Sequence, residues 1–237
     1  MSRPTLRDWA KLKRLGRYLV GKPRLVYNYE FQESQGNITV YSDANWASGK
    51  ECRKSTSGGV ILNGNHYVKS WGKTQSLVAL SSAESELYAL VKASAESLGI
   101  KTTLKDMNKP IGILMFSDAS AALGIIQRQG LGRVRHVDCS FLFVQDLNAR
   151  KTIQYGKVAG AENPADLGTK GLAFDTISRH VEFIRAEFRG GRPELCPKIL
   201  SRLTSEGGQS EGGCKDHGAP AAILASVVQL AATPRAP

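Results

Sequence analysis

Apolar residues recur at helical spacing near the start of the chain, from Thr5 to Val20, which predicts an amphipathic helix with a basic polar face. Gly21-Lys22-Pro23 is expected to end this helix. Residues 25–31 then alternate like a strand, and residues 34–37 form a turn pattern. The basic face of the helix fits either a solvated packing element or a direct contact with phosphate, and the pattern leaves both open.

From residue 38 onward, the pattern predicts three short strands in succession. An apolar run at 38–41 leads to Asp43. The β-type runs 58–62 and 67–71 flank Asn63-Gly64-Asn65, and an Asn-Gly pair favours the tight turn of a hairpin. We therefore expect one strand followed by a two-stranded hairpin.

A helix is expected next, because Ser81 and Glu84 have the spacing of a capping box. Apolar residues from 87 to 98 give this helix one apolar stripe, and Gly99 is expected to end it. The continuous apolar run at 113–116 is typical of a buried strand. The remaining expected elements are helices at 120–129 and 136–149, a strand at 152–158 and a short helix after Pro164.

Acidic residues stand at the ends of these expected elements. Asp43 follows the first strand, Glu86 lies near the start of the helix, and Asp118 follows the buried strand, while Asp166 is a fourth candidate. Sites in open α/β sheets gather beyond the carboxyl ends of central strands, so these side chains can converge. Clustered carboxylates repel one another, and Mg²⁺ or Mn²⁺ relieves that repulsion because hard cations prefer oxygen ligands.

Each acid also has a structural interpretation. Asp43 and Asp118 stand where Asp commonly caps a helix or a turn. Glu84 fits the capping box, whereas Glu86 lies past the cap. Asp166 falls in an expected first helical turn, where an acid suits the helix dipole. The residues alone therefore leave both a metal site and a set of caps open.

The charge balance favours a polyanionic partner. Among 237 residues, 32 are Lys or Arg and 21 are Asp or Glu, which gives a net charge of +11. Lys and Arg gain affinity for nucleic acid by releasing counterions from phosphates. Residues 190–237 are rich in Gly, Pro, Ser and Ala, and we expect them to form a disordered tail.

The cysteines show no C-x-x-C spacing, so neither a structural zinc site nor a disulfide framework is expected. The first residues alternate charge with isolated apolar positions, which argues against a signal peptide. The apolar stretch at 219–232 is too short to span a bilayer. We expect an intracellular protein, in the cytoplasm or nucleus, with no membrane contact and no small-molecule cofactor.

A series of ordered motifs covers residues 38–172. They are Tyr41-Ser42-Asp43-Ala44-Asn45-Trp46-Ala47, Arg53-Lys54-Ser55-Thr56-Ser57-Gly58-Gly59, Ser70-Trp71-Gly72-Lys73, Val78-Ala79-Leu80-Ser81-Ser82-Ala83-Glu84-Ser85-Glu86-Leu87, Ser117-Asp118-Ala119-Ser120-Ala121-Ala122, Arg135-His136-Val137-Asp138 and Asn163-Pro164-Ala165-Asp166-Leu167-Gly168-Thr169-Lys170. Together they resemble the ribonuclease H domain of copia-type LTR retrotransposon polyproteins. The opening helix, with Tyr27 after it, resembles the end of the reverse-transcriptase connection just upstream.

The resemblance implies an α/β ribonuclease H-like fold, a five-stranded mixed sheet flanked by helices. It divides the chain into a connection remnant at 1–36, a ribonuclease H-like domain at 37–189 and the tail. It implies endonucleolytic cleavage of the RNA strand in RNA–DNA hybrids with two Mg²⁺ ions, for which Mn²⁺ can substitute. A reverse-transcriptase polymerase domain is a further expected partner.

The resemblance also implies site residues. The family's acidic ligands map to Asp43, Glu86, Asp118 and Asp166, as catalytic and metal-binding residues. Glu86 is preferred to Glu84 because Glu86-Leu87-Tyr88-Ala89 matches the family's helix better. The expected nucleic-acid-binding residues are Arg53, Lys54, Ser55, Lys73, Ser82, Arg135 and His136.

The chain departs from its cellular relatives at one position. Those relatives carry a His in a loop before the last Asp, where this chain has Ala159-Gly160-Ala161, and copia-type members generally lack that His as well. The chain has no polymerase Asp-Asp motif, so no DNA synthesis is expected. The alternative hypothesis is a catalytically silent fragment that keeps the fold and binds only nucleic acid or a partner. A DNA transposase or resolvase of related fold matches the motifs less well.

Overall fold

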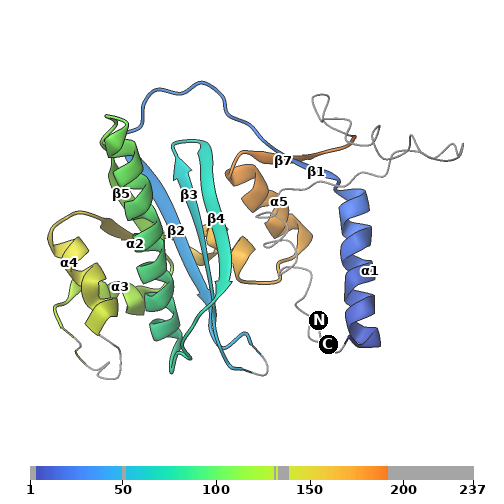
Figure 1. The fold of residues 1–237 in the computed structure, drawn as a ribbon, viewed down its shortest axis with the longest axis horizontal. Helices are drawn as coiled ribbons and strands as arrows, with labels where there is room; N and C mark the ends of the chain where they lie inside the picture. Colours follow the sequence, from blue (N-terminus) through green and yellow to red (C-terminus); the bar gives the residue numbers. More distant parts are fainter. Residues whose placement is uncertain (1–3, 50–51, 131, 133–138, 192–237) are drawn as a thin grey trace, which may run out of the picture.

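The computed structural model describes residues 4–49, 52–130, 132 and 139–191. Its centre is a five-stranded sheet with the order β4-β3-β2-β5-β6 (Figure 1). The strands are β2 (Asn37–Asn45), β3 (Thr56–Asn63), β4 (His66–Thr74), β5 (Gly112–Ser117) and β6 (Gln154–Lys157). The first three are antiparallel neighbours, whereas β5 and β6 run parallel to β2. This is the five-stranded mixed sheet expected from the sequence.

Helices cover both faces of the sheet. Helix α2 (Ser82–Asp106) packs across one face, with α3 (Ser120–Gln127) and α4 (Phe143–Ala149) beside it (Figure 1). On β3, Ile61 belongs to the core beneath α2, whereas Val60 and Leu62 belong to a second core with α5 (Phe174–Phe183). Successive side chains of a strand point to opposite faces, so one apolar strand serves both cores.

Two expected boundaries differ from the structure. Strand β2 does not end near residue 41 but continues through Asp43, because its residues 42–45 pair with residues 56–59 of β3. Helix α2 does not end at Gly99 but continues for another two turns to Asp106. A Gly inside a helix costs only about 1 kcal/mol relative to Ala, which a long packed helix tolerates.

Other elements differ in length or type from their expected forms. The helix expected at 136–149 is, in its described part, the 3-10 turn η1 (Cys139–Leu142) followed by α4, and residues 136–138 lie outside the described residues. The short helix after Pro164 is the 3-10 turn η3 (Pro164–Gly168), preceded by another 3-10 turn, η2 (Gly160–Glu162). Helix α5 and strand β7 (Ala186–Arg189) were not expected. The expected tail lies outside the described residues from 192 onward.

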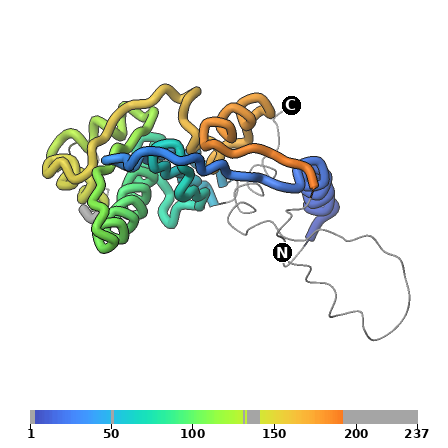
Figure 2. The backbone as a smooth tube through the Cα atoms, turned by 90° about the horizontal axis from the view of Figure 1, so that it is seen from above, coloured from blue at the N-terminus to red at the C-terminus, as the bar shows by residue number. Residues whose placement is uncertain are grey.

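A second, two-stranded sheet joins the two ends of the described chain. Strand β1 (Arg24–Tyr27), shorter than the strand expected at 25–31, pairs antiparallel with β7. Figure 2 shows β1 in blue beside β7 in orange. Helix α1 (Leu6–Gly21) precedes β1 and begins with a complete capping box at Thr5. None of the described helices is long and apolar enough to cross a bilayer.

The segment between β1 and β2 is fixed to the β3–β4 hairpin. The Gln32 side chain donates to the Asn63 carbonyl at 2.7 Å and accepts from the Asn65 backbone at 2.9 Å. The Tyr29 hydroxyl donates to the Tyr67 carbonyl at 2.9 Å. Residues 22–36 thus contact the central domain closely, although the boundary expected after residue 36 divides them from it.

Truncation tests that boundary. Removal of residues 1–21 should leave the β1–β7 sheet intact, whereas removal of 1–36 should also delete β1 and the Gln32 contacts. We expect the chain without residues 1–36 to unfold at a clearly lower temperature than the chain without residues 1–21. Each kcal/mol of unfolding free energy that is lost should lower the midpoint by about 2–4 °C, as measured by circular dichroism. Equal unfolding midpoints for the two truncated chains would show that the domain begins at residue 37.

Candidate metal centre

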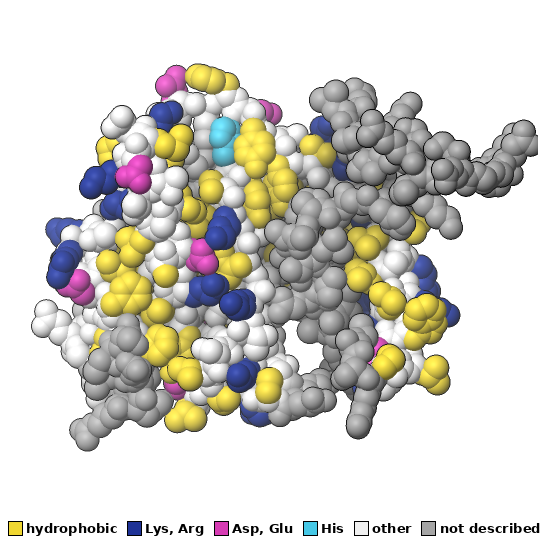
Figure 3. Space-filling model, viewed as in Figure 1, with side chains coloured by type: hydrophobic (Ala, Val, Ile, Leu, Met, Phe, Trp, Pro, Cys, Tyr) yellow, Lys and Arg dark blue, Asp and Glu magenta, His cyan; other side chains and the backbone are white. Residues whose placement is uncertain are grey.

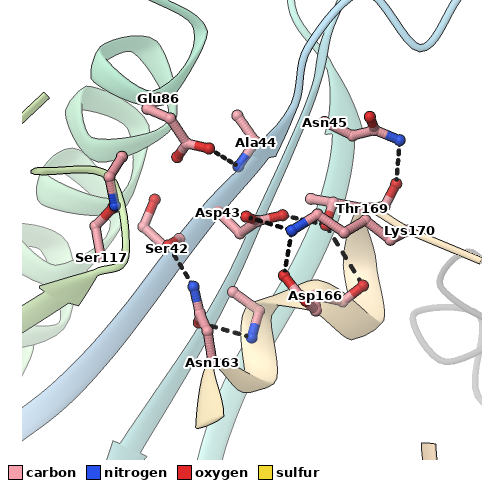
Figure 4. Close-up of polar contacts among 12 residues, drawn as sticks. Ser42, Asp43, Ala44, Asn45, Glu86, Ser117, Asn163, Asp166, Thr169 and Lys170 are labelled. Carbon is pink, nitrogen blue, oxygen red and sulfur yellow. Dashed lines mark hydrogen bonds and ion pairs between the residues drawn. The ribbon is translucent and has the colours of Figure 1, made fainter. Parts of the chain in front are cut away.

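Asp43 lies inside β2, opposite Gly58 of β3, and its side chain is only 1% exposed. Its Oδ1 accepts a hydrogen bond from Lys170 Nζ at 3.0 Å, and its Oδ2 accepts from the Thr169 hydroxyl (Figure 4). A carboxylate buried in the middle of a strand caps no helix. The capping interpretation of Asp43 therefore does not describe its position.

The two candidate glutamates of α2 have different surroundings. The Ser81 hydroxyl caps α2 by accepting from the Glu84 backbone at 3.2 Å. The Glu84 carboxylate accepts from the Leu80 backbone at 2.9 Å and from the Tyr88 hydroxyl at 2.5 Å, so it serves the start of the helix. Glu86 instead points toward β2, where its Oε1 accepts from the Ala44 backbone at 3.2 Å (Figure 4). These contacts favour Glu86 as the ligand and Glu84 as the structural partner.

Asp118 directly follows β5, the parallel neighbour of β2. The buried Ser117 hydroxyl accepts from the Ala119 backbone at 3.2 Å and so shapes the turn that carries Asp118. Because the two parallel strands end at the same edge of the sheet, Asp118 reaches the side on which Asp43 and Glu86 lie.

The side chains of Asp43, Glu86 and Asp118 form one acidic trio, with a carboxylate oxygen from each lying within 4.8 Å of the others. Burial, followed by the charges of Asp43 and Asp118, raises the pKa of Glu86 to about 8. Glu86 Oε2 is buried and has no hydrogen-bond partner among the described residues. A buried acceptor of this kind is costly unless a donor or cation satisfies it, so the trio fits a divalent cation.

Asp166 lies in η3 and reaches the trio through Lys170, whose Nζ is 2.8 Å from Asp166 Oδ1. The buried Asn163 starts this turn by accepting from the Ala165 backbone, and it donates to the Ser42 carbonyl of β2 at 3.0 Å. Burial, followed by the charge of Asp43, raises the pKa of Asp166 to about 6. Asn163 thus anchors the fourth acid to the strand that carries Asp43.

Two glycines let this turn approach the sheet. A Cβ added at Gly58 would lie 2.7 Å from the Ala165 carbonyl, and one added at Gly168 would lie 2.7 Å from the Trp71 carbonyl. Both contacts are with backbone atoms, so larger residues would push η3 away from β3 and β4. Gly58 therefore matters to the site although it carries no functional group.

Sequence reasoning assigned no role to Lys170, Thr169 or Asn163, which all contact β2 around Asp43. A signal for Lys170 was present, because it follows Asp166 by four residues, the spacing of a helical ion pair. The contacts of Thr169 and Asn163 span more than a hundred residues, and local spacing does not reveal them.

The expected nucleic-acid-binding residues that are described lie close to the same end of the sheet. Lys73 of β4 pairs with Ser57 of β3, and the next residue of β3, Gly58, pairs with Asp43. Both Lys73 and Arg53 are exposed. Lys54 is partly exposed, and Ser82 is exposed at the start of α2.

Ser55 is buried, and its hydroxyl accepts from the Ala47 backbone at 3.0 Å, so it fixes the turn after β2. Arg135 and His136 lie outside the described residues.

Sheet order, strand directions and the acidic trio together define a ribonuclease H-like domain. Residues of this chain are 26% identical over 209 positions to the retrovirus-related Pol polyprotein from transposon RE2 of Arabidopsis thaliana, covering 84% of this chain. Homologues of this chain are thus retrovirus-related Pol polyproteins from transposons, which confirms the resemblance seen in its motifs. It spans only 14% of the length of the RE2 polyprotein.

Two further comparisons extend this picture. The secreted RxLR effector protein 161 of Plasmopara viticola is 42% identical over 100 residues, which are 41% of this chain and 68% of that protein. The N-terminal RNase H domain of Rv2228c from Mycobacterium tuberculosis superposes with a TM-score of 0.42 at 12% identity, over 62% of this chain and 98% of that one. No family model matches the chain.

Glu86 should make the metal-free protein less stable at alkaline pH. In the unfolded chain this carboxyl loses its proton near its ordinary pKa of 4.5, whereas in the folded protein it keeps the proton up to about pH 8. The unfolded state binds fewer protons between these values, so stability falls as pH rises from 4.5 to 8. Glu86→Gln carries no charge and should therefore raise the unfolding temperature in EDTA at pH 8 by several degrees, at about 2–4 °C for each kcal/mol.

The gain should shrink toward pH 4.5 and vanish below it, where the wild-type carboxyl is protonated in both states. Glu84→Gln is the matched control, because it weakens the contacts to Leu80 and Tyr88 and should lower the midpoint. Thermal unfolding followed by circular dichroism in EDTA measures both variants. A Glu86→Gln midpoint at or below that of the wild type at pH 8 would contradict a buried, mutually repelling trio.

Proposed function

We propose that this chain is a metal-dependent endonuclease that cleaves the RNA strand of RNA–DNA hybrids. One observation carries the proposal: Asp43, Glu86 and Asp118 place carboxylate oxygens within 4.8 Å of one another, and Glu86 Oε2 is buried without a partner. The similarity to retrovirus-related Pol polyproteins supports the same assignment. The proposal concerns this chain and not the whole polyprotein, since the chain spans 14% of the length of the RE2 relative.

The proposed metals are two Mg²⁺ ions, for which Mn²⁺ can substitute. Asp43, Glu86 and Asp118 would hold the first, and Asp166 would complete the acidic set for the second. Bound divalent cations activate a water and stabilise the leaving oxygen of a phosphodiester. The protein's own part is to hold these carboxylates at fixed positions on β2, on α2, directly after β5 and on η3.

The proposed substrate surface begins beside the acids. The exposed Arg53 and Lys73 lie at the open end of the β3–β4 hairpin, away from its turn and near Gly58. Together with Lys54 they are suited to contact phosphates. We keep Ser82, Arg135 and His136 as further proposed contacts, whereas the buried Ser55 would act only through the turn that it fixes. Hybrid recognition through the minor groove and 2′-hydroxyls should show weak sequence preference.

We also propose a reverse-transcriptase polymerase domain as partner and an intracellular location. The partner proposal is supported by the length of the polyprotein relatives and by α1, whose Leu6, Trp9 and Leu12 are exposed. Figure 3 shows apolar side chains at the surface of this helix. Such a helix face is suited to burial against a further domain.

A cleavage assay tests the function. The purified chain is given a labelled RNA–DNA hybrid with Mg²⁺, and Asp43→Asn is measured beside it. The control is Asp146→Asn, whose exposed carboxylate pairs only with Arg150 among the ion pairs of the described residues. We expect Asp43→Asn to lose about 100-fold or more of the rate, because it removes a buried ligand of the cation. Asp146→Asn should cleave like the wild type, and EDTA should abolish cleavage.

Two results would contradict the proposal. Wild-type protein that cleaves with neither Mg²⁺ nor Mn²⁺ would support the alternative, a catalytically silent fold that only binds nucleic acid or a partner. Equal cleavage by Asp43→Asn and the wild type would place the reaction elsewhere. Strong dependence on the base sequence of the hybrid would contradict the proposed recognition of shape.

A further inference from the structure

Lys170 brings an ammonium group into the acidic centre. Its Nζ lies 3.0 Å from Asp43 Oδ1 and 2.8 Å from Asp166 Oδ1, so one cation bridges two carboxylates (Figure 4). The Lys170 side chain is 36% exposed, whereas those of Asp43 and Asp166 are 1% and 13% exposed. Lys170 therefore reaches the buried acids from the solvent side.

The bridge is held in place from both sides. The Asn163 amide donates to the Ser42 carbonyl at 3.0 Å, and the Asn45 amide donates to the Thr169 carbonyl at 3.1 Å. The Thr169 hydroxyl donates to the second oxygen of Asp43. Since β2 is fixed to η3 at both ends of the turn, the Lys170 contact differs from a mobile ion pair on an exposed surface.

The charge on Lys170 persists at neutral pH. Burial alone would lower the pKa of Lys170, but its hydrogen bond to Asp166 and the charges of Asp43 and Asp166 outweigh burial and raise it. The ammonium is thus a fixed positive charge beside four carboxylates. It balances part of the negative charge of Asp43 and Asp166. The buried Glu86 Oε2 has no hydrogen-bond partner among the described residues.

We propose that Lys170 is a tethered counter-ion that competes with a second divalent cation for Asp43 and Asp166. The free protein accordingly takes up one ion at Asp43, Glu86 and Asp118. A second ion binds only after the ammonium leaves the Asp43–Asp166 pair. Lys170 is thus a positioning residue that sets metal stoichiometry. The inference rests on the proposed metal-dependent function, because it concerns the same acids.

Mn²⁺ titration of the full chain without nucleic acid tests this inference. Electron paramagnetic resonance of free Mn²⁺ counts the bound ions and needs no cleavage. We expect about one ion per wild-type chain and about two for Lys170→Met, which keeps a chain of similar length without the charge. Lys170→Arg retains the charge and should bind about one. The double variant Lys170→Met/Asp166→Asn should return to about one, because it removes the acid that a second ion needs.

Three results would overturn the proposal: two ions on the wild type, no ion on the wild type, or equal stoichiometry for Lys170→Met and wild type. Lys170→Gln, which also removes the charge, takes the place of Lys170→Met if that variant fails to fold. Failure of the nuclease proposal can be told apart from failure of the Lys170 proposal, because cleavage and the number of bound ions are measured separately. A wild type that cleaves while Lys170→Met binds no extra ion refutes the role of Lys170 alone. A silent wild type in which Lys170→Met gains an ion refutes the nuclease alone.

Discussion

Mutual repulsion among buried carboxylates is the constraint around which this domain is arranged. Four acids, carried by β2, by α2, by the turn after β5 and by η3, come together in a region where burial disfavours the charged forms of Glu86 and Asp166. The fold holds the acids there by strand pairing and by a side-chain contact that do not involve the carboxylates. Parallel pairing fixes Asp118 relative to Asp43, and Asn163 ties the Asp166 turn to β2. The large cores on both faces of the sheet supply the stability that this crowding reduces.

The sheet and the convergence of three acids could be predicted from the sequence, because both depend on patterns within short segments. The order of apolar runs predicted the strands of the central sheet and α2, and the end positions of Asp43, Glu86 and Asp118 predicted their convergence. The same reasoning placed Asp43 after its strand, since the apolar run stops at residue 41. The polar residues 42–45 belong to the strand only because β3 pairs with them, and this pairing is a property of the whole sheet.

The contacts that sequence reasoning missed join distant segments. Helix α5 and strand β7 follow the last motif. Their apolar residues pack against Val60 and Leu62 on the face of β3 opposite α2, and local spacing does not reveal this contact. Gly58 belongs to an expected strand, yet its importance lies in the backbone of η3 that passes above it. Thr169 likewise acquires its role from a partner more than a hundred residues away. Motif order located the acids, whereas tertiary packing decides what surrounds them.

The small β1–β7 sheet has a consequence for a domain whose relatives are long polyproteins. Its two strands carry the chain into and out of the domain, and they are hydrogen-bonded to each other in antiparallel register. Tension applied through flanking polypeptide on both sides would reach this pair before it reached the central sheet. The β1–β7 sheet can thus separate under force while β2, β5 and α2 keep their relative positions. A pull from neighbouring domains would then leave the carboxylate geometry undisturbed.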